Sequence, residues 1–307
     1  VALLINKKMK FTVWSLLLMI VFFTFLTFYS WHFDVVKDCG CFGDALHLTP
    51  FQSFMKDIVL LVLITFIFIK RNEIKPLFVE TASTYAAYAG FIASFCFSMY
   101  CYMHLPVIDF RPYAIGSSIP EGMQLPPNAK KDSVVMVFIY EKDGKQLELN
   151  MDQLSTLDDT YKFIDRKDKV IVEGDKPKIH DFTINSVDGS DITEDVLKQP
   201  SVFLLVAYDI KHSDEGVQSQ VNDFVALCQK AGVEFMGLTA SAPKEVDDFR
   251  HQHNSTFDYY FTDGTTLKTI VRSNPGLVLL QNGVVKGMWH HNDFPTFDEV
   301  KKMYLNK

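Results

Sequence analysis

The pattern of apolar and polar positions divides the chain near residue 105. Before that point, three apolar runs predict membrane-spanning helices at residues 11–31, 50–69 and 81–105, because about 20 apolar residues cross a bilayer. The first run contains no charged residue, is too long for a signal peptide and lacks a small-residue cleavage site. The pattern therefore predicts an α-helical transmembrane bundle of three spans, with the lipid bilayer as its partner.

The second span is expected to begin at Pro50. Thr49, Pro50 and Gln52 occupy the N-cap, N1 and N3 positions of a capping box. Lys56 and Asp57 then follow about two turns into the helix. Two interpretations of these charges stay open. Either Lys56 reaches out to the membrane interface, or it has a functional role, as half of a partly buried ion pair or as a cation near the cysteines, since intramembrane charge is costly.

The third apolar run is rich in Ala, Ser and Gly, which suits close packing between helices in lipid. Cys96 and Cys101 lie in its last three turns. Residues 1–5 form another short apolar run, which ends in the polar residues 6–8. Such a run is typical of the last turn of a preceding membrane helix, so we expect an N-terminally truncated bundle; a processed or engineered start is the alternative.

Basic residues indicate how the spans are oriented. Lys and Arg cluster before the first span at residues 7–10 and after the second at residues 70–75, whereas the loop between these spans is acidic and carries only Lys37. By the positive-inside rule both clusters are cytoplasmic. The loop and everything after Leu105 then share the outer compartment, where disulfides persist.

The loop between the first two spans contains Cys39 and Cys41, separated by Gly40. A disulfide between them would close a tight ring, and Gly40 relieves the backbone restriction. Strained disulfides are easily reduced and belong to the catalytic class. The N-terminus of the second span and Lys56 are expected to favour a thiolate. The loop is therefore a candidate for thiol–disulfide exchange.

Cys101, near the outer end of its helix, and Cys96 are the candidate relays for this exchange. Three other interpretations of the loop cysteines stay open: a static disulfide that pins the loop, free thiols that only pack, and a metal site. The metal site would need His32 and His47, which offer no standard ligand spacing.

The composition limits the partners and the number of units. The 307 residues carry a net charge of −7 without a basic face, so no nucleic-acid partner is expected. The five cysteines are too few for a disulfide-stapled scaffold. We predict a transmembrane region at residues 1–105, a connector with a small β-rich segment at 106–175, and an α/β domain at 176–307.

The soluble part alternates strands and helices in its second half. The predicted elements are a hairpin at 134–150, a strand at 169–172, an extended segment at 179–184, a central strand at 202–208, a helix at 216–230, a strand at 233–238, a helix at 243–253, a hairpin at 277–289 and a closing helix at 297–304. From residue 202 onward this order resembles the thioredoxin-type fold, with residues 273–275 at its cis-proline site.

The active site of that fold is a Cys-x-x-Cys between the first core strand and its helix. Residues 208–214 occupy that place without a cysteine, and Cys228 is expected in the core. We therefore predict a binding or presenting module that cannot exchange disulfides itself. The histidine pairs at residues 251 and 253 and at residues 290 and 291 lack a third ligand, so they are expected on the surface and no metal site is predicted.

The segment DCGCFGDALHLTPFQSFMKDIVLL at residues 38–61 resembles the DoxX/MauE-like membrane protein family in the form found in Bacteroidetes. In that form a CGCFGD loop precedes a Leu-Thr-Pro/Asn-aromatic-Gln helix start. The resemblance covers about residues 1–71, and residues 104–123 resemble the longer members, which add a fifth helix and a soluble domain. Members usually place this loop between the third and fourth of four membrane helices, which implies helices upstream of Val1.

MauE-like members are implicated in disulfide handling during methylamine dehydrogenase maturation, and DoxX-like members in quinone-linked sulfur oxidation. Of the functional residues of this family, only Cys39, Cys41 and their loop can be assigned to positions in this sequence. The resemblance implies a bacterial inner-membrane redox protein with its cysteine loop and C-terminal domain in the periplasm. It would exchange electrons with a periplasmic protein thiol and pass them to a quinone or a partner protein. The alternative is a non-enzymatic membrane subunit with a fixed cysteine clip and a domain that recruits a partner.

Overall fold

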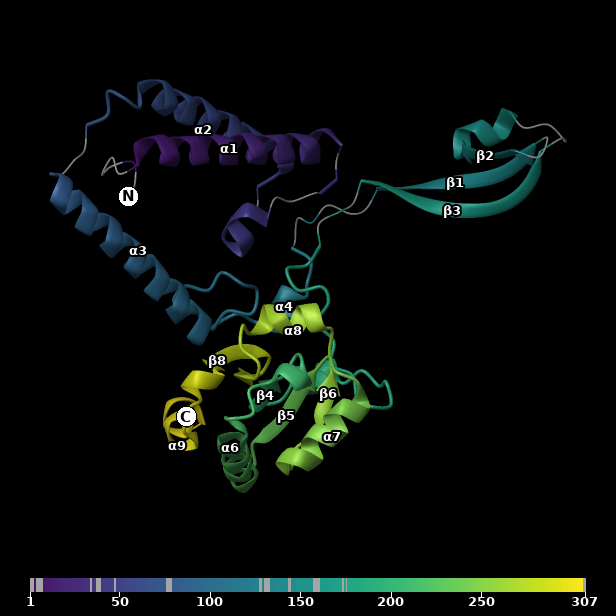
Figure 1. Ribbon diagram of the computed structural model, residues 1–307. Helices are drawn as coiled ribbons and strands as arrows, with labels where there is room; N and C mark the ends of the chain where they lie inside the picture. The colour runs from purple at the N-terminus through teal and green to yellow at the C-terminus, as the bar shows by residue number, and fades with distance from the viewer. Residues whose placement is uncertain are drawn as a thin grey trace.

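The computed structural model describes residues 3, 8–33, 35, 36, 40–46, 48–75, 79–126, 129, 133–142, 145–156, 161–172, 174 and 176–305. These residues form a helical part, a small antiparallel sheet and an α/β domain (Figure 1). Three helices are long and apolar enough to cross a membrane: α1 (Met9–His32), α2 (Pro50–Lys70) and α3 (Glu80–Met103). The predicted spans are confirmed to within a few residues at each end.

Helices α1 and α2 lie side by side as an antiparallel pair (Figure 1). The buried side chains of α1 include Val13, Ile20 and Thr27, which recur every seven residues. Such a repeat keeps one stripe of a helix against its neighbour. Aromatic rings complete the contact, with Trp14 packed edge-on against Phe68 at 4.9 Å between ring centres.

The start of α2 is the predicted capping box. The Thr49 side chain accepts a hydrogen bond from the Gln52 N–H at 3.3 Å, and the Gln52 side chain accepts one from the Thr49 N–H at 3.0 Å. Two N–H groups that the first helical turn leaves unpaired are thereby satisfied. The capping box fixes where the cysteine loop ends and the span begins.

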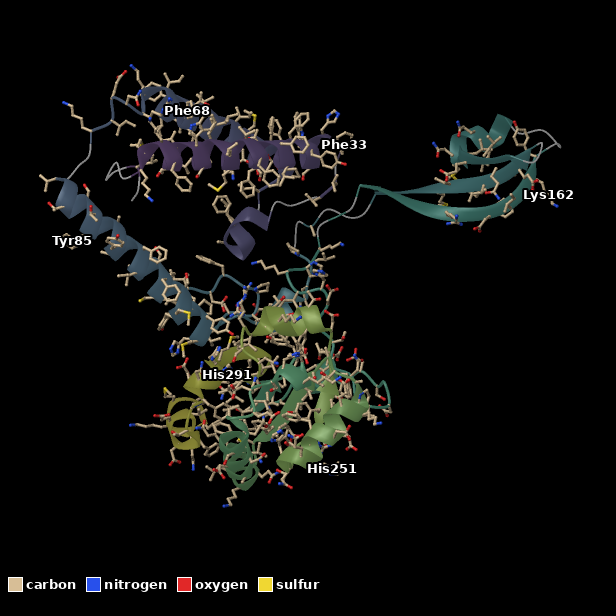
Figure 2. All side chains as sticks on the ribbon, in the orientation of Figure 1. Phe33, Phe68, Tyr85, Lys162, His251 and His291 are labelled. Atoms are coloured by element: carbon tan, nitrogen blue, oxygen red, sulfur yellow. The ribbon has the colours of Figure 1, made fainter. Side chains whose placement is uncertain are left out.

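Helix α3 runs at an angle to the α1–α2 pair (Figure 1). Its large side chains are exposed along its length, for example Tyr85, which is labelled in Figure 2. Exposed apolar side chains on a span of this length are what contact with lipid requires. In the α1–α2 pair, too, residues such as Leu18 and Phe22 face outward.

The small sheet contains β1 (Ser133–Lys142), β2 (Lys145–Asn150) and β3 (Lys162–Val172), in the order β2-β1-β3 with antiparallel pairing. The predicted hairpin is confirmed, although its turn at residues 143 and 144 lies outside the described residues. The predicted strand at 169–172 is the end of the longer β3. A 3-10 helix, η2 (Met151–Thr156), follows β2.

The α/β domain is built on a second sheet of order β6-β5-β4-β7-β8. Its strands are β4 (Val202–Val206), β5 (Glu234–Thr239), β6 (Tyr259–Phe261), β7 (Gly276–Gln281) and β8 (Val284–His290). The first three are parallel to one another, and β7 and β8 are antiparallel additions. The Asn274–Pro275 peptide bond is cis, as predicted. This strand order with its cis proline is the thioredoxin-like arrangement.

Helices cover both faces of this sheet, so β4 is buried on both sides. Phe203 and Leu205 face α6 and α7, while Leu204 and Val206 face α8. Because both faces of β4 are buried, its sequence at residues 202–206 is continuously apolar. The helices are α4 (Ile119–Gly122), α5 (Thr193–Leu197), α6 (Gln218–Ala231), α7 (Pro243–His253), α8 (Gly264–Ile270) and α9 (Phe297–Val300), with a single π turn after α9 at Lys301–Leu305.

Three features of the domain differ from the sequence-based expectation. Residues 179–184 form no regular strand, although Ile179 and Phe182 are buried in the core beside α8. The short elements β6 and α8 lie between the predicted α7 and the cis proline, where no element was expected. Strand β6 has three residues, too few for a recognisable alternation of apolar and polar positions.

The segment after α3 is fastened to the domain by Arg111. Its guanidinium donates two hydrogen bonds to the Asp109 carboxylate, at 2.7 and 2.6 Å, and a third to the Thr269 carbonyl at 3.2 Å. Arg111 is 7% exposed, and Tyr113 lies in the same core cluster as Phe182. The backbone then pairs with β8 between Ser118 and Val284. Residues 109–119 thus pack as part of the domain body.

Protonation of Asp109 is expected to weaken this anchor. Burial raises the pKa of its carboxyl, but hydrogen bonds and charge from Arg111 outweigh burial, so the pKa lies below 3.8. A pKa lowered by folding stabilises the native state above the unfolded value, and this stabilisation is lost as pH falls through the folded value. We expect Asp109→Asn to cost about 1.5 kcal/mol at pH 7 and progressively less as the pH falls below 3.8. Thermal unfolding of both proteins across this range measures the difference, and a pH-independent difference contradicts the assignment.

Candidate functional site

The loop between α1 and α2 contains the predicted redox cysteines. Cys39 lies outside the described residues, and Cys41 is described through its backbone alone, within the 3-10 turns of η1 (Gly40–Ala45). Gly43 divides these turns at φ 54° and ψ −140°. Glycine enters this region without steric cost because it has no Cβ. The chain can therefore reverse just after Cys41 and Phe42.

Lys56 lies beside this loop. Its Nζ is 3.0 Å from Oδ1 of Asp57 and 5.4 Å from the centre of the Phe42 ring, which directly follows Cys41. A cation within about 6 Å of an aromatic ring is attracted to it. Of the two interpretations of Lys56, the structure supports the ion pair near the cysteine loop. Lys56 thereby connects the loop to the buried face of α2.

Asp57 is a buried carboxylate in a membrane-spanning helix, with 2% of its surface exposed. Besides Lys56, its partner is Thr27 on α1, whose Oγ1 donates to Oδ2 at 3.0 Å. One turn earlier on α2, Ser53 is fully buried, and its hydroxyl has no hydrogen-bond partner within the described part of the chain. Charged groups at such depth are expensive and are associated with function. The cluster Thr27–Ser53–Lys56–Asp57 is therefore the polar centre of the α1–α2 pair.

Sequence reasoning noted Asp57 only as the neighbour of Lys56 and missed Thr27 and Ser53. A signal for Thr27 was available, because it continues the seven-residue repeat of Val13 and Ile20. A polar residue in such a stripe faces the neighbouring helix. The partner across the contact, however, depends on how α1 and α2 align, which the individual runs do not specify.

The candidate relays Cys96 and Cys101 are both exposed, free thiols on α3. They are five positions apart, so they point in directions that differ by about 140° around the helix axis. A single target cannot contact both side chains from one side of α3. Cys228 is fully buried between α6 and the sheet, as predicted, and burial raises the pKa of its thiol to about 12. A thiol held neutral in this way does not take part in exchange.

In the α/β domain, the position of the usual Cys-x-x-Cys is occupied by η3 (Ile210–His212). The cis-proline loop lies directly against it: the Asn274 side chain donates to the Asp209 carbonyl at 2.7 Å, and the Asp214 N–H donates to the Asn274 carbonyl at 2.9 Å. A hydrogen bond from His212 lowers the pKa of the Asp209 carboxyl. The domain face formed by η3 and the cis-proline loop therefore carries carboxylates and imidazoles in place of thiols.

The histidine pairs are not uniformly at the surface. His251 is exposed, as predicted (Figure 2), but His290 is 3% exposed, and the prediction is wrong for it. His290 ends β8, where the tertiary structure covers its side chain. Burial and the neighbouring His291 lower its pKa, so it is neutral near pH 7. Within the described residues, no three His, Cys, Asp or Glu side chains are arranged to hold a metal ion.

The end of α3 contacts the α/β domain near the cis-proline loop. Nδ1 of His104 is 2.8 Å from both carboxylate oxygens of Asp293, and the Asn292 side chain donates to the Met103 carbonyl at 2.9 Å. Two residues before Asp293, His291 lies 3.0 Å from the Ser273 hydroxyl (Figure 2). The last turn of the third span is therefore connected to the domain face that carries the cis proline.

Two family models match parts of the chain. Residues 1–70 match the methylamine utilisation protein MauE, and residues 134–173 match a domain of unknown function, DUF8463. The first match contains α1, the cysteine loop and α2; the second contains most of the small sheet. The N-terminal region is MauE-like. Comparison with curated proteins yields no match.

Several solved structures are similar to part of the chain at low identity and low TM-score. A thioredoxin-like protein from Aeropyrum pernix is 14% identical at a TM-score of 0.33, with 40% of this chain and 86% of that chain covered. StoA from Bacillus subtilis is 16% identical at 0.31, with 39% and 93% covered. The thioredoxin domain of a thiol-disulfide oxidoreductase from Bacteroides vulgatus is 10% identical at 0.32, with 39% and 91% covered. The thioredoxin-like fold of the α/β domain rests on its own strand order and cis proline, and residues 1–70 match the MauE family model.

Proposed function

We propose that this protein is a membrane-bound thiol–disulfide redox protein in which Cys39 and Cys41 carry the exchange. The observation that supports this most directly is the position of Lys56, whose ammonium lies over the ring of Phe42 and pairs with buried Asp57. A cation close to a cysteine favours its thiolate, which is the reactive form. The MauE-like identity of residues 1–70 agrees with a role in disulfide handling.

The proposed reaction has two steps. A thiolate of a substrate protein attacks the Cys39–Cys41 disulfide and forms a mixed disulfide, and the second substrate thiol then displaces it. The substrate leaves with a disulfide, while Cys39 and Cys41 become thiols. A quinone, or a partner protein with its own disulfide, next accepts two electrons and two protons and restores the Cys39–Cys41 disulfide. Where the substrate does not reach the loop itself, Cys101 or Cys96, acting singly, is the proposed relay: its thiolate opens the loop disulfide, the substrate thiolate attacks the resulting mixed disulfide at the relay sulfur, and the second substrate thiol releases the relay.

The thioredoxin-like domain is proposed to hold the substrate protein. Its exchange position contains Asp209 and His212 in place of cysteines, and its cis-proline face is connected to α3 through His104 and Asp293. We propose the division into residues 1–105, 106–175 and 176–307, with residues 109–119 of the middle segment packed onto the domain. We also propose a location in the inner membrane, with the cysteine loop and the domain in the periplasm.

The second candidate is a non-enzymatic membrane subunit whose cysteine loop is a fixed clip. It is favoured by the domain itself, because a thioredoxin-like frame without exchange cysteines can only bind. In this alternative the periplasmic domain recruits a partner protein, and no electrons flow through Cys39 and Cys41.

The reduction potential of the loop distinguishes the two candidates. The full chain is equilibrated in membranes with graded thiol buffers, alkylated, and digested to quantify the peptide that contains Cys39 and Cys41. We expect a midpoint between about −120 and −270 mV, the range of exchanging dithiols. A loop that stays oxidised below about −300 mV is a clip and overturns the redox proposal.

A further inference from the structure

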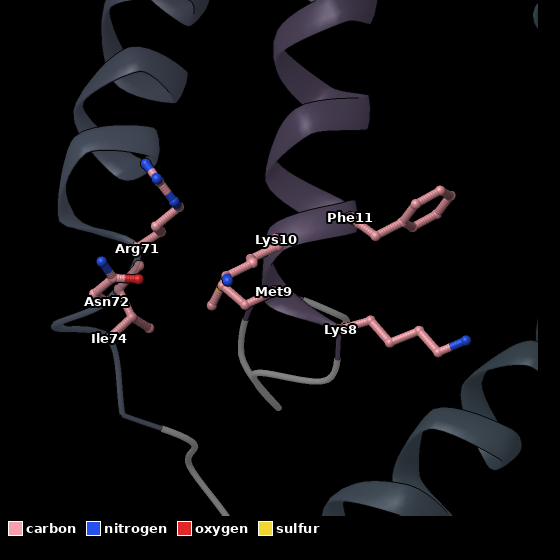
Figure 3. A pocket seen from close by; sticks show the side chains of 7 residues that line it. All are labelled: Lys8, Met9, Lys10, Phe11, Arg71, Asn72 and Ile74. Atoms are coloured by element: carbon pink, nitrogen blue, oxygen red, sulfur yellow. The ribbon is translucent and has the colours of Figure 1, made fainter.

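The other end of the α1–α2 pair contains a hollow that the redox proposal does not use (Figure 3). It has a volume of about 520 Å³ and lies between the start of α1 and the end of α2. Its lining residues are Lys8, Met9, Lys10, Phe11, Arg71, Asn72 and Ile74. Three of these are cations, and no carboxylate is among them. The hollow is therefore positively charged.

Arg71 is held in place at this hollow. Its Nη1 donates to the Phe68 carbonyl at 2.7 Å, and its guanidinium lies 4.5 Å from the centre of the Phe68 ring. Figure 3 shows Lys10 and Met9 of α1 directed toward the end of α2, while Lys8 and Phe11 point away from it. The neighbouring Lys70 differs, because Glu73 neutralises it at 2.8 Å. Within the described part of the chain, the donors at the hollow without an acidic partner are thus Arg71 and Lys10, with the Asn72 amide beside them.

The depth of the hollow points to a lipid. It lies where two membrane-spanning helices end, which is the level of the headgroups. Trp14, one turn further into the span, is 51% exposed and packs against Phe68 of α2, so an apolar ring adjoins the charged rim. Basic hollows between the ends of membrane helices bind anionic headgroups by charge and hydrogen bonding.

We propose that this hollow binds the phosphate of an anionic phospholipid, with Arg71 and Lys10 as the cations and Asn72 as an additional donor. The acyl chains lie along the exposed ring of Trp14, which packs against Phe68. The site is independent of the chemistry of the cysteine loop. Its occupant keeps the cytoplasmic ends of α1 and α2 neutral, so removal of the lipid leaves like charges facing each other there.

Lipid titration of the full chain tests this site. The protein is placed in phosphatidylcholine nanodiscs, and phosphatidylglycerol binding is measured by native mass spectrometry. Each cation near an anionic surface contributes about fivefold in affinity, so Lys10→Gln/Arg71→Gln should weaken binding about 25-fold. The matched control, Lys70→Gln/Lys75→Gln, removes the same charge from the same side, but neither residue lines the hollow and Glu73 already pairs with Lys70, so it should change binding less than about threefold.

Three further measurements make the result decisive. The conservative variant Lys10→Arg/Arg71→Lys should retain binding, and circular dichroism should show equal helix content in every variant. Inorganic phosphate at the same phosphate concentration should not displace the lipid. Equal losses in the two double Gln variants overturn the site, because they indicate a diffuse charge effect. Displacement by inorganic phosphate overturns the lipid assignment.

Discussion

Replacing Cys39 and Cys41 together by Ser is expected to lower the rate at which the protein oxidises a periplasmic dithiol substrate by more than about 100-fold. A hydroxyl cannot form the mixed disulfide through which the electrons move, so the remaining rate is that of uncatalysed exchange. The three other cysteines cannot substitute. Cys228 is buried and neutral, and Cys96 and Cys101 point in different directions on α3. The rate is measured in membrane vesicles as loss of substrate thiols.

Cys228→Ala is the matched control for this experiment. It removes a thiol of the same chain that the fold keeps out of reach, and it should leave the rate unchanged while slightly destabilising the core. If the double Ser variant oxidises the substrate as fast as this control, the loop cysteines carry no exchange and the binding-subunit alternative stands. Mixed with the oxidised, disulfide form of the substrate, a single Ser variant should trap a mixed disulfide, because its remaining thiolate attacks the substrate disulfide in the reverse of the exchange step, and this identifies the reactive sulfur.

Replacing Asp57 by Ala is expected to destabilise the α1–α2 pair by about 3 kcal/mol. The change removes the acceptor of the Thr27 hydroxyl and leaves Lys56 without its partner, 3.0 Å away in the native protein. Breaking a buried ion pair from one side leaves an uncompensated charge, and this costs more than the pair itself contributes. Because Lys56 is 31% exposed, the effect lies at the lower end of the usual range. Denaturant titration of the protein in detergent micelles measures the loss.

Two further variants calibrate this result. Thr27→Val keeps the shape of the side chain and removes one interhelical hydrogen bond, for a cost of about 1 kcal/mol. Lys56→Gln leaves the buried Asp57 carboxylate without its cation and should cost about 3 kcal/mol, as much as Asp57→Ala. Thr27→Val should therefore be the mildest of the three. A cost of Lys56→Gln as small as that of Thr27→Val contradicts the pairing of Lys56 with a buried carboxylate.

The predictions from sequence were most accurate for elements that are specified by one short segment of the chain. The capping box at Thr49 and Gln52 and the three spans depend on local hydrogen bonds and on the length of apolar runs, and all are present. The cis peptide before Pro275 also follows from a local motif. Strand β6 and helix α8 were missed because their few residues are selected by contacts with β5 and the core cluster.

The sequence revealed only part of the candidate site. The sequence places Lys56 about two turns into α2, but its position over Phe42 depends on how the loop folds back. The Thr27–Asp57 hydrogen bond joins residues thirty positions apart. The burial of His290 likewise comes from segments distant in the chain. Such contacts have no local signature, because the partner is chosen by packing.

By itself, the sequence determined that this chain enters the membrane, where its spans lie and which basic residues flank them. Hydrophobic length and charge act residue by residue, so they can be read from a linear string. The tertiary structure alone decided that Asp57 is buried against Thr27, that Lys56 adjoins the cysteine loop, and that Arg71 and Lys10 share a hollow. Each of these pairs unites two helices, and only their mutual packing brings the two side chains within reach of each other or of one ligand.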